Sequence, residues 1–214
     1  MRNQTQPVAV EGYPFIALFA FVTLIFSLLG WSVLTVLSLL LCLFTIYFFR
    51  NPERHPPADP QAVVSPADGK VVFVGTVRED RYSQAEAVKV SIFMSVFNVH
   101  VNRVPFSGKV VDMFYNKGEF FNASLDKASL QNEQAGILLE TENGKRLLFV
   151  QIAGLIARRI ISYPVVGDLL RRGQRYGLIR FGSRVDLYFP LGAEVTVQVG
   201  DNAVAGESVL GYLK

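Results

Sequence analysis

Residues 70–93 read KVVFVGTVREDRYSQAEAVKVSIF, and this stretch decides the fold class. It holds two runs of β-branched and aromatic residues, which fit the pleated, half-buried surface of a β-strand, separated by a polar connection. Because Gly, Asn, Asp or Pro punctuate the runs, residues 62–214 are predicted to form a mainly β sandwich or barrel of antiparallel strands. Runs of this kind lie at Lys70–Val77, Ala87–Phe93, Val110–Tyr115, Gly136–Glu140, Arg146–Ile152, Arg184–Phe189 and Glu194–Val199.

A short sequence pattern that occurs twice in the chain refines this prediction. Gly167-Asp168 and Gly200-Asp201 are each followed by a further glycine, six residues after the first. Such Gly-Asp turns resemble those of lipoyl and biotinyl carrier domains, so we expect a flattened barrel or sandwich like the lipoyl-type barrel-sandwich hybrids. The alternative is two ordinary turns whose glycines supply positive φ. In neither case does the pattern make the aspartates catalytic candidates.

Before the β-rich part, residues 14–49 contain no charged side chain. One helix of that length would extend roughly 54 Å, against about 30 Å of hydrocarbon in a bilayer. Two short helices, Pro14–Leu29 and Trp31–Phe49, with a turn near Gly30–Trp31, fit better. The sequence therefore predicts an N-terminal helical hairpin that is transmembrane or re-entrant. A buried pair of core helices is the alternative, although core helices usually carry a polar face.

Basic residues flank this hairpin. Arg2 precedes it, while Arg50 and Arg54 follow it. By the positive-inside bias, both ends and the domain behind them should lie on the cytoplasmic side of the cell membrane. Residues 51–61, NPERHPPADPQ, are rich in proline and charge and are predicted to be a linker. The chain is thus divided into a hairpin (1–50), a linker (51–61) and a β domain (62–214).

The charge balance gives no reason to expect nucleic acid as a partner. The net charge is +3, and leaving out Arg2, Arg50 and Glu11 of the first fifty residues leaves 19 basic and 17 acidic groups. The single cysteine, Cys42, lies in the apolar run, which excludes a disulfide framework and a thiolate metal site. The sequence also has no His, Cys and carboxylate cluster at metal-ligand spacing and no Gly-rich phosphate loop.

Few residues of the β-rich part indicate chemistry by themselves. His100 is its one histidine, and a single strand histidine is more often structural than catalytic. Asp68, in the sequence SPADGK, fits an ordinary turn. Gly182-Ser183 is more unusual, because a Gly-Ser pair weakens the strand-like runs on both sides of it. A local purpose for this pair is therefore favoured.

Four motifs in this order resemble the phosphatidylserine decarboxylase family, in its short bacterial and archaeal form. The resemblance covers residues 48–214, and the apolar hairpin in front also matches that form. The motifs are Pro66-Ala67-Asp68-Gly69, Asn98-Val99-His100-Val101-Asn102-Arg103-Val104-Pro105, Asn132-Glu133 and Arg180-Phe181-Gly182-Ser183.

The resemblance implies a proenzyme that cuts itself between Gly182 and Ser183. The Ser183 hydroxyl would attack the Gly182 carbonyl, and elimination and hydrolysis would then leave Ser183 as a pyruvoyl group and release ammonia. Glycine permits a strained turn and leaves its carbonyl open to attack. The products would be a large membrane-associated chain, 1–182, and a small pyruvoyl chain, 183–214, held together as a heterodimer.

The same resemblance implies a reaction on a phospholipid. The pyruvoyl carbonyl would form a Schiff base with the serine amine of phosphatidylserine and accept electrons as carbon dioxide leaves, giving phosphatidylethanolamine without a metal or pyridoxal phosphate. Because the Ser183 hydroxyl needs a base, His100 with Asp68 as its orienting partner is the candidate pair. His100 is also the candidate proton donor after decarboxylation.

One departure from the family pattern concerns Arg103. Longer members carry two histidines, five and two residues before the proline, whereas here His100 and Arg103 precede Pro105 at these positions. Either His100 serves both cleavage and decarboxylation, or Asp68 acts more directly in cleavage. Arg103 could bind the lipid phosphate or carboxylate or form an ordinary salt bridge. Glu133 could line the site or be a surface residue.

Two other functions stay open at this point. A membrane-tethered carrier of the lipoyl type would need a modifiable lysine at an exposed hairpin tip. Lys70 is the candidate, although its apolar neighbours suggest that it begins a strand. A pyruvoyl enzyme acting on a soluble amino acid would have no need of the hairpin. The number of chains in the purified protein separates the carrier from the decarboxylase.

Overall fold

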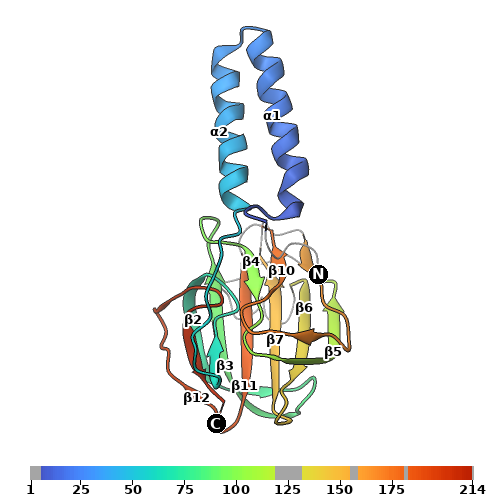
Figure 1. Ribbon diagram of the computed structural model, residues 1–214, viewed down its shortest axis with the longest axis vertical. Coiled ribbons are helices and arrows are strands. Elements are labelled where there is room, and N and C mark those ends of the chain that lie inside the picture. The colour runs from blue at the N-terminus through green and yellow to red at the C-terminus, as the bar shows by residue number, and fades with distance from the viewer. Residues whose placement is uncertain (1–5, 119–131, 155–158, 181–182, 214) are drawn as a thin grey trace. The chain divides into compact units, whose positions relative to one another are not determined.

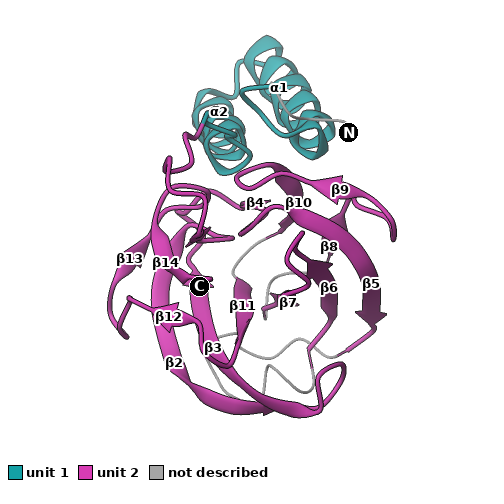
Figure 2. Ribbon diagram, turned by 60° about the horizontal axis from the view of Figure 1, so that its bottom comes forward, with its two compact units in different colours: residues 1–53 teal, residues 54–214 magenta. Residues whose placement is uncertain are grey.

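The computed structural model (Figure 1) describes residues 6–118, 132–154, 159–180 and 183–213. The chain forms two compact units, residues 1–53 and residues 54–214, coloured separately in Figure 2. Helices make up the first unit, and the regular structure described in the second unit is β-strand. The predicted mainly β fold, preceded by an apolar helical segment, is therefore confirmed.

The first unit is a helical hairpin. Helix α1 spans Tyr13–Leu28, after a short 3-10 turn η1 at Val10–Gly12, and α2 spans Ser32–Phe48. Gly30, in the turn between them, has a φ of +73°, a backbone conformation that favours glycine. By length and composition the segment Val10–Leu28, with 19 residues and a mean hydropathy of 1.8, could cross a bilayer, whereas α2 is apolar but shorter.

Helix α2 has one narrow face of small side chains. Ser38, Cys42 and Thr45 are buried on it, and the Cys42 thiol lies 3.8 Å from the backbone oxygen of Ile16 in α1. Small residues let two helices approach closely, as in membrane helix pairs. Most large apolar side chains of both helices are exposed, so the outer surface of the hairpin suits lipid better than water.

The second unit is built from strands of two to eleven residues. Within the described ranges they are β1 Ala62–Val64, β2 Gly69–Glu79, β3 Ala85–Met94, β4 Val101–Arg103, β5 Gly108–Asn116, β6 Gln134–Glu140, β7 Arg146–Ala153, β8 Ile160–Ser162, β9 Leu169–Leu170, β10 Arg175–Ile179, β11 Ser183–Pro190, β12 Glu194–Val195, β13 Asn202–Ala203 and β14 Val209–Tyr212.

The largest sheet has eight strands in the order β13-β2-β3-β11-β7-β6-β5-β9, with every neighbouring pair antiparallel. It curls into a half-barrel, as Figure 2 shows. Two small sheets, β1-β14-β12 and β4-β10-β8, complete the unit. Strand β11 is central, because it pairs with β3 along its whole length and with β7 over Ser183–Tyr188.

Side chains of β11 alternate between the two faces of this sheet. Val185, Leu187 and Phe189 are fully buried in the main core on the inner face, together with residues of β3, β6 and β7. Ser183 shares their side of the strand. On the outer face, Tyr188 packs against a smaller apolar cluster.

The outer face of β11 also carries a buried ion pair. The Arg184 guanidinium meets the Asp186 carboxylate through Nε and Oδ1 at 2.8 Å and through Nη2 and Oδ2 at 3.0 Å, and their side chains are 3% and 0% exposed. The contact between Nη2 and Oδ2 is a charge-assisted hydrogen bond, a strong class of interaction. The pair follows Ser183 directly, so it fixes the beginning of the central strand.

Replacing Arg184 by methionine should destabilise the fold by about 3–5 kcal/mol, because it leaves the Asp186 charge buried without its partner. Urea unfolding in a Ser183→Ala background, which keeps every sample a single chain, measures this change. The double variant Arg184→Met, Asp186→Leu should recover most of the loss. Arg146→Met is the matched control, since its partner Glu140 forms an exposed pair, and should cost under about 1 kcal/mol. Equal losses in both single variants would contradict the prediction.

The two Gly-Asp pairs of the sequence form two turns with the same structure. Gly167 and Gly200 have φ values of +97° and +105°, and each turn docks by the same hydrogen bonds on a long strand, β5 or β2. Each aspartate accepts a hydrogen bond from the backbone N–H three residues before it. The docking bonds are Gly167 N to Val110 O at 2.8 Å and Val110 N to Asp168 O at 2.9 Å, and Gly200 N to Val71 O and Val71 N to Asp201 O, both at 2.9 Å.

Several strand predictions differ from the structure in length. The run Glu194–Val199 forms a strand only over β12, because the Asp201 carboxylate accepts the Gln198 N–H at 2.9 Å and turns the chain. Lys70, the candidate carrier lysine, is the second residue of β2 and not a hairpin tip.

The proline-rich segment that begins the second unit is fastened to it. The Arg172 guanidinium donates to the backbone oxygens of Pro57, Asp59 and Ala62 at 2.7, 2.5 and 2.7 Å. Proline leaves few backbone donors for a regular ladder, so a side chain supplies the hydrogen bonds. This segment therefore follows a defined path over the β unit.

Candidate active site

Ser183 is the first residue of the central strand β11. Its side chain is fully buried on the inner face, and its hydroxyl donates to the Met94 sulfur at 3.4 Å. Met94 is the cross-strand partner of Ser183 in β3. Gly182, the other half of the predicted cleavage site, lies outside the described residues. The Ser183 backbone is thus held between two neighbouring strands, and its hydroxyl contacts a weak acceptor, the Met94 sulfur.

The Asn132-Glu133 motif brackets the other cross-strand partner of Ser183, which is Ala153 in β7. Asn132 Nδ2 donates to Ala153 O at 2.7 Å, and Ala153 N donates to Glu133 O at 3.0 Å. This clamp fixes the backbone beside the serine. The sequence left Glu133 as a site or surface residue, and the structure places it 5% exposed next to the strand that carries Ala153.

The Glu133 carboxylate has described partners of its own. It accepts the Tyr115 hydroxyl at 2.8 Å and the Ile160 N–H at 3.3 Å. The hydrogen bond to Glu133, with a smaller contribution from burial, raises the pKa of Tyr115 above its usual value. These contacts give Glu133 a positioning task at the edge of the site.

His100 is buried just ahead of β4, and its backbone oxygen accepts the Ile179 N–H at 3.3 Å. Ile179 ends β10, the strand that leads into the Gly182-Ser183 motif. His100 Nδ1 lies 3.0 Å from the backbone oxygen of Asn98. Because a carbonyl oxygen can only accept, Nδ1 carries the proton in neutral His100, and Nε2 is left as the acceptor. This tautomer is the one that a base at Nε2 requires.

Asn102 is the middle residue of β4, two residues after His100, which precedes that strand. Its Nδ2 lies 3.6 Å from the Met94 sulfur and 3.4 Å from Pro66 O, and its Oδ1 accepts from Gln151 Nε2 at 2.9 Å. Asn102 and Ser183 therefore touch the same sulfur atom. Sequence reasoning did not single out Asn102, Gln151 or Met94.

Asp68 has other partners than the predicted one. Its Oδ1 accepts the Ala205 N–H at 2.7 Å, and its Oδ2 pairs with Arg54 Nη2 at 3.0 Å. Arg54 also pairs with Glu207 at 3.2 Å. The carboxylate thus fastens the chain near Arg54 and Ala205, and its described contacts do not include His100. In this structure the backbone oxygen of Asn98 occupies the orienting position that the sequence assigned to Asp68.

Arg103 faces away from this group, because it is adjacent to Asn102 in β4. It is 6% exposed, and its Nη1 donates to Gly173 O at 2.9 Å. Gly173 has a φ of +77° in the turn between β9 and β10. The contact gives Arg103 a structural task in the turn, and its lipid contact stays a prediction.

Comparison with known proteins shows the family of this chain. The family model described as phosphatidylserine decarboxylase matches residues 41–211. The chain belongs to the phosphatidylserine decarboxylase family. It is 67% identical to the phosphatidylserine decarboxylase proenzyme of Syntrophotalea carbinolica, with all of both chains covered. The proteins of the same name from Geotalea uraniireducens and Geobacter sulfurreducens are 55% and 54% identical, again over all of both chains.

Membership of the phosphatidylserine decarboxylase family makes this chain an enzyme of phospholipid metabolism, a decarboxylase, and decides against the carrier alternative.

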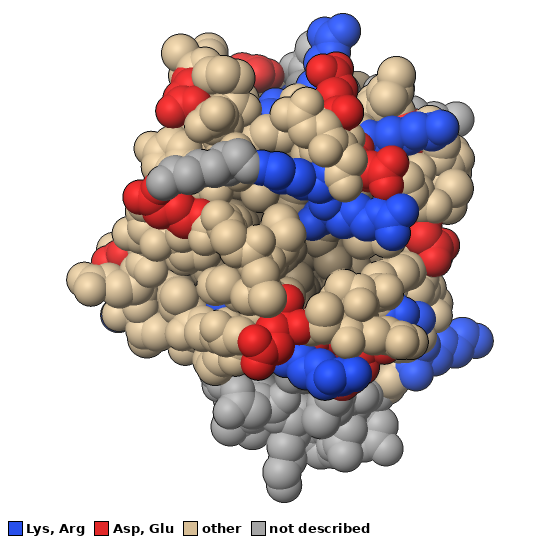
Figure 3. Space-filling view, turned by 90° about the horizontal axis from the view of Figure 1, so that it is seen from below, with Lys and Arg blue, Asp and Glu red and all other residues tan. Residues whose placement is uncertain are grey.

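Within the described ranges, no group of three or more His, Cys, Asp or Glu side chains could hold a metal ion. On the face in Figure 3, acidic and basic side chains are interspersed.

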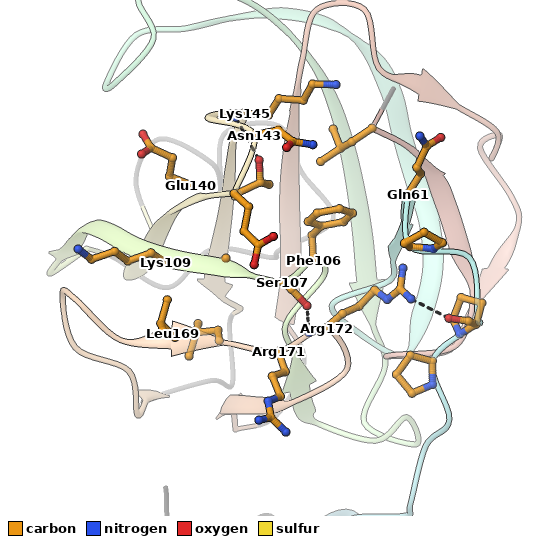
Figure 4. Close-up of a pocket in the computed structure, with 18 residues that line it drawn as sticks. Gln61, Phe106, Ser107, Lys109, Glu140, Asn143, Lys145, Leu169, Arg171 and Arg172 are labelled. Atoms are coloured by element: carbon orange, nitrogen blue, oxygen red, sulfur yellow. Dashed lines mark hydrogen bonds between the residues drawn. The ribbon is translucent and has the colours of Figure 1, made fainter.

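A pocket of about 1050 Å³ lies elsewhere on the β unit (Figure 4). Phe106, Lys109, Leu169 and Arg171 are among its lining residues, and Ser183, His100 and Asp68 are not. In Figure 4 the Lys109 and Arg171 side chains point away from each other. The pocket therefore does not gather its cations around one ligand position.

Proposed function

We propose that this chain decarboxylates phosphatidylserine to phosphatidylethanolamine with a pyruvoyl group that it makes from Ser183. The observation that carries the proposal is the position of Ser183, at the first residue of a central strand, where its hydroxyl contacts the same Met94 sulfur as the Asn102 amide. Family membership and the proenzyme name of the relatives support it.

Self-cleavage would begin at the Ser183 hydroxyl. His100 Nε2, which the Asn98 contact leaves as the acceptor, takes the hydroxyl proton. The serine oxygen then attacks the Gly182 carbonyl. As the peptide C–N bond breaks, protonated His100 gives its proton to the leaving nitrogen, which becomes a free amine, and the product is an ester. Loss of the Ser183 α-proton expels the Gly182 carboxylate, and water replaces the nitrogen to leave a ketone and ammonia.

A pyruvoyl group fits the surroundings of Ser183. It has the carbon skeleton of the serine that it replaces, so it needs no additional space beside Met94 and Ala153. The group supplies a carbonyl that condenses with the serine amine of the lipid and accepts the electrons released with carbon dioxide. His100 would deliver a proton to the headgroup carbon afterwards. Glu133 and Asn132 hold the strand beside the reacting residue.

The chain arrangement is part of the proposal. We infer a hairpin (1–50), a linker (51–61) and a β domain (62–214), with cleavage into chains 1–182 and 183–214 that remain a heterodimer. The exposed apolar surface of the hairpin supports attachment to the cell membrane, and the flanking arginines support a cytoplasmic β domain. A substrate that is itself a membrane lipid gives the hairpin its purpose.

The intact masses of the purified protein should reveal two chains. The small one should contain 32 residues, 183–214, and should be lighter than the corresponding serine peptide by one ammonia. Because its first residue has no amine, Edman sequencing of the small chain should be blocked. One intact chain of 214 residues in an active preparation would contradict the proposal.

The substrate is tested separately. Carbon dioxide release from phosphatidylserine in nanodiscs should be stopped by hydroxylamine, which captures ketones. Free serine should be a poor substrate, which separates a lipid decarboxylase from an enzyme of soluble amino acids. Comparable rates on both compounds would favour the soluble substrate.

A further inference from the structure

Two amide side chains in the core near Ser183 are not explained by the fold. Asn102 is 0% and Gln151 is 1% exposed. The neighbours of Gln151 on the same face of β7, Phe149 and Ala153, belong to the apolar core. Burying an amide costs free energy even when part of its hydrogen bonding is satisfied. An apolar residue would suit this position better if packing alone mattered.

The hydrogen bonds decide which way the Asn102 amide points. Its oxygen accepts from Gln151 Nε2 at 2.9 Å, so its nitrogen faces Pro66 O at 3.4 Å and the Met94 sulfur at 3.6 Å. The reversed amide would direct its oxygen at the Pro66 carbonyl, and two acceptors would then face each other without a donor. Gln151 therefore sets the orientation of Asn102.

Met94 connects this pair to the reacting residue. Its sulfur accepts from the Ser183 hydroxyl at 3.4 Å and lies 3.6 Å from Asn102 Nδ2. A thioether is a weak acceptor on a flexible side chain, so the position of the sulfur depends on its other contacts. Among the described residues, Gln151 Oε1 has no hydrogen-bond partner. The fold thus tolerates an unsatisfied acceptor at one atom of Gln151 while its nitrogen holds Asn102.

We propose that Asn102 and Gln151 are positioning residues for self-cleavage at Ser183, an inference that rests on the proposed function. Gln151 orients Asn102, and Asn102 holds the Met94 sulfur and the Pro66 carbonyl. Met94 in turn holds the Ser183 hydroxyl through the contact at 3.4 Å. Without the Gln151 donor the hydroxyl samples other rotamers, and fewer of them are aligned for attack.

Two variants of Gln151 test this chain of contacts. Gln151→Met keeps the shape of the side chain but removes the donor, so cleavage should slow roughly tenfold to a hundredfold. Gln151→Glu can donate to Asn102 only when its carboxyl is protonated. The full chain is produced by cell-free translation into nanodiscs, and the uncut and cut forms are followed over time by gel and intact mass.

The pH profile distinguishes positioning from loss of structure. Wild-type cleavage needs neutral His100, so it should slow on acidification. Burial raises the pKa of the carboxyl that Gln151→Glu introduces, and the ionised form would turn the Asn102 amide around. Cleavage by Gln151→Glu should therefore fall a second time as the pH rises through that pKa. Neither the wild type nor Gln151→Met should have this alkaline limb.

Ser91→Ala is the matched control, because Ser91 is also buried in the same sheet, in β3, and its hydroxyl has no hydrogen-bond partner in the described part of the chain. It should be cut at the wild-type rate. A wild-type chain that is never cut would overturn the proposed function itself. Normal cutting of Gln151→Met, or a Gln151→Glu profile without an alkaline limb, would overturn only the positioning role. If Gln151→Met does not fold by circular dichroism, the Gln151→Glu profile decides alone.

Discussion

A Ser183→Ala protein should remain one uncut chain of 214 residues and release no carbon dioxide from phosphatidylserine. Alanine has no oxygen to attack the preceding carbonyl, and it cannot become a ketone. The substitution removes only the oxygen that faces Met94, so the paired strands β3, β11 and β7 should keep their register. Gel electrophoresis and intact mass measure the cut, and a carbon dioxide assay measures the reaction.

Two further variants sharpen this result. Ser183→Cys retains a nucleophile at the same atom and should be cut to a measurable extent, since a thiol can replace the hydroxyl in the first step. Ser91→Ala should behave as the wild type in both assays. A Ser183→Ala protein that is still cut at the same bond would show that another group drives the cleavage.

His100→Ala should slow both reactions if, as proposed, the same Nε2 is the base in cleavage and the acid in decarboxylation. Loss of a general acid–base group typically costs about a hundredfold to ten-thousandfold in rate. Cleavage occurs once per molecule, so slow processing can still finish over hours. Decarboxylation repeats at every turnover, so its loss should be evident in a steady-state assay of the chains that have been cut.

The chain provides its own control for this variant. His55→Ala removes the other of the two histidines, in the proline-rich segment, and should change neither rate. Asp68→Asn gives a third comparison, since it weakens the ion pair with Arg54 while keeping the shape of the side chain. Normal cutting of His100→Ala with slow cutting of Asp68→Asn would transfer the base role to Asp68.

The sequence could predict the long strands and the two helices, because their patterns are local. Runs of β-branched and aromatic residues lie inside β2, β3, β5, β6, β7 and β11. The two-residue strands β9 and β13 could not be predicted, since their hydrogen bonds come from partners far along the chain. Gly30 marked the helical turn because few other residues adopt its φ of +73°.

The site was predictable only where a motif carries the information. Ser183, His100 and Asp68 were chosen from such motifs, and their catalytic roles stay predictions. The contact between Asp68 and Arg54 was not predicted. The sequence analysis had already assigned Arg54 a role as one of the basic residues that flank the membrane hairpin. Gln151 could have been noticed as the one polar residue in the apolar run LLFVQIA of β7. Its pairing with Asn102, 49 residues earlier, is a tertiary contact that no local pattern contains.

The central position of β11 in the sheet has a consequence for the order in which the protein folds and is cut. A cut ahead of Ser183 opens the polypeptide but leaves the strand paired with eight residues of β3 and six of β7. The small chain cannot leave without unfolding the half-barrel. Assembly must therefore precede the cut, and a denatured, processed molecule would have to rejoin two pieces that were made as one. Under the proposed mechanism, each molecule would acquire its reactive carbonyl once and would have no means of replacing it.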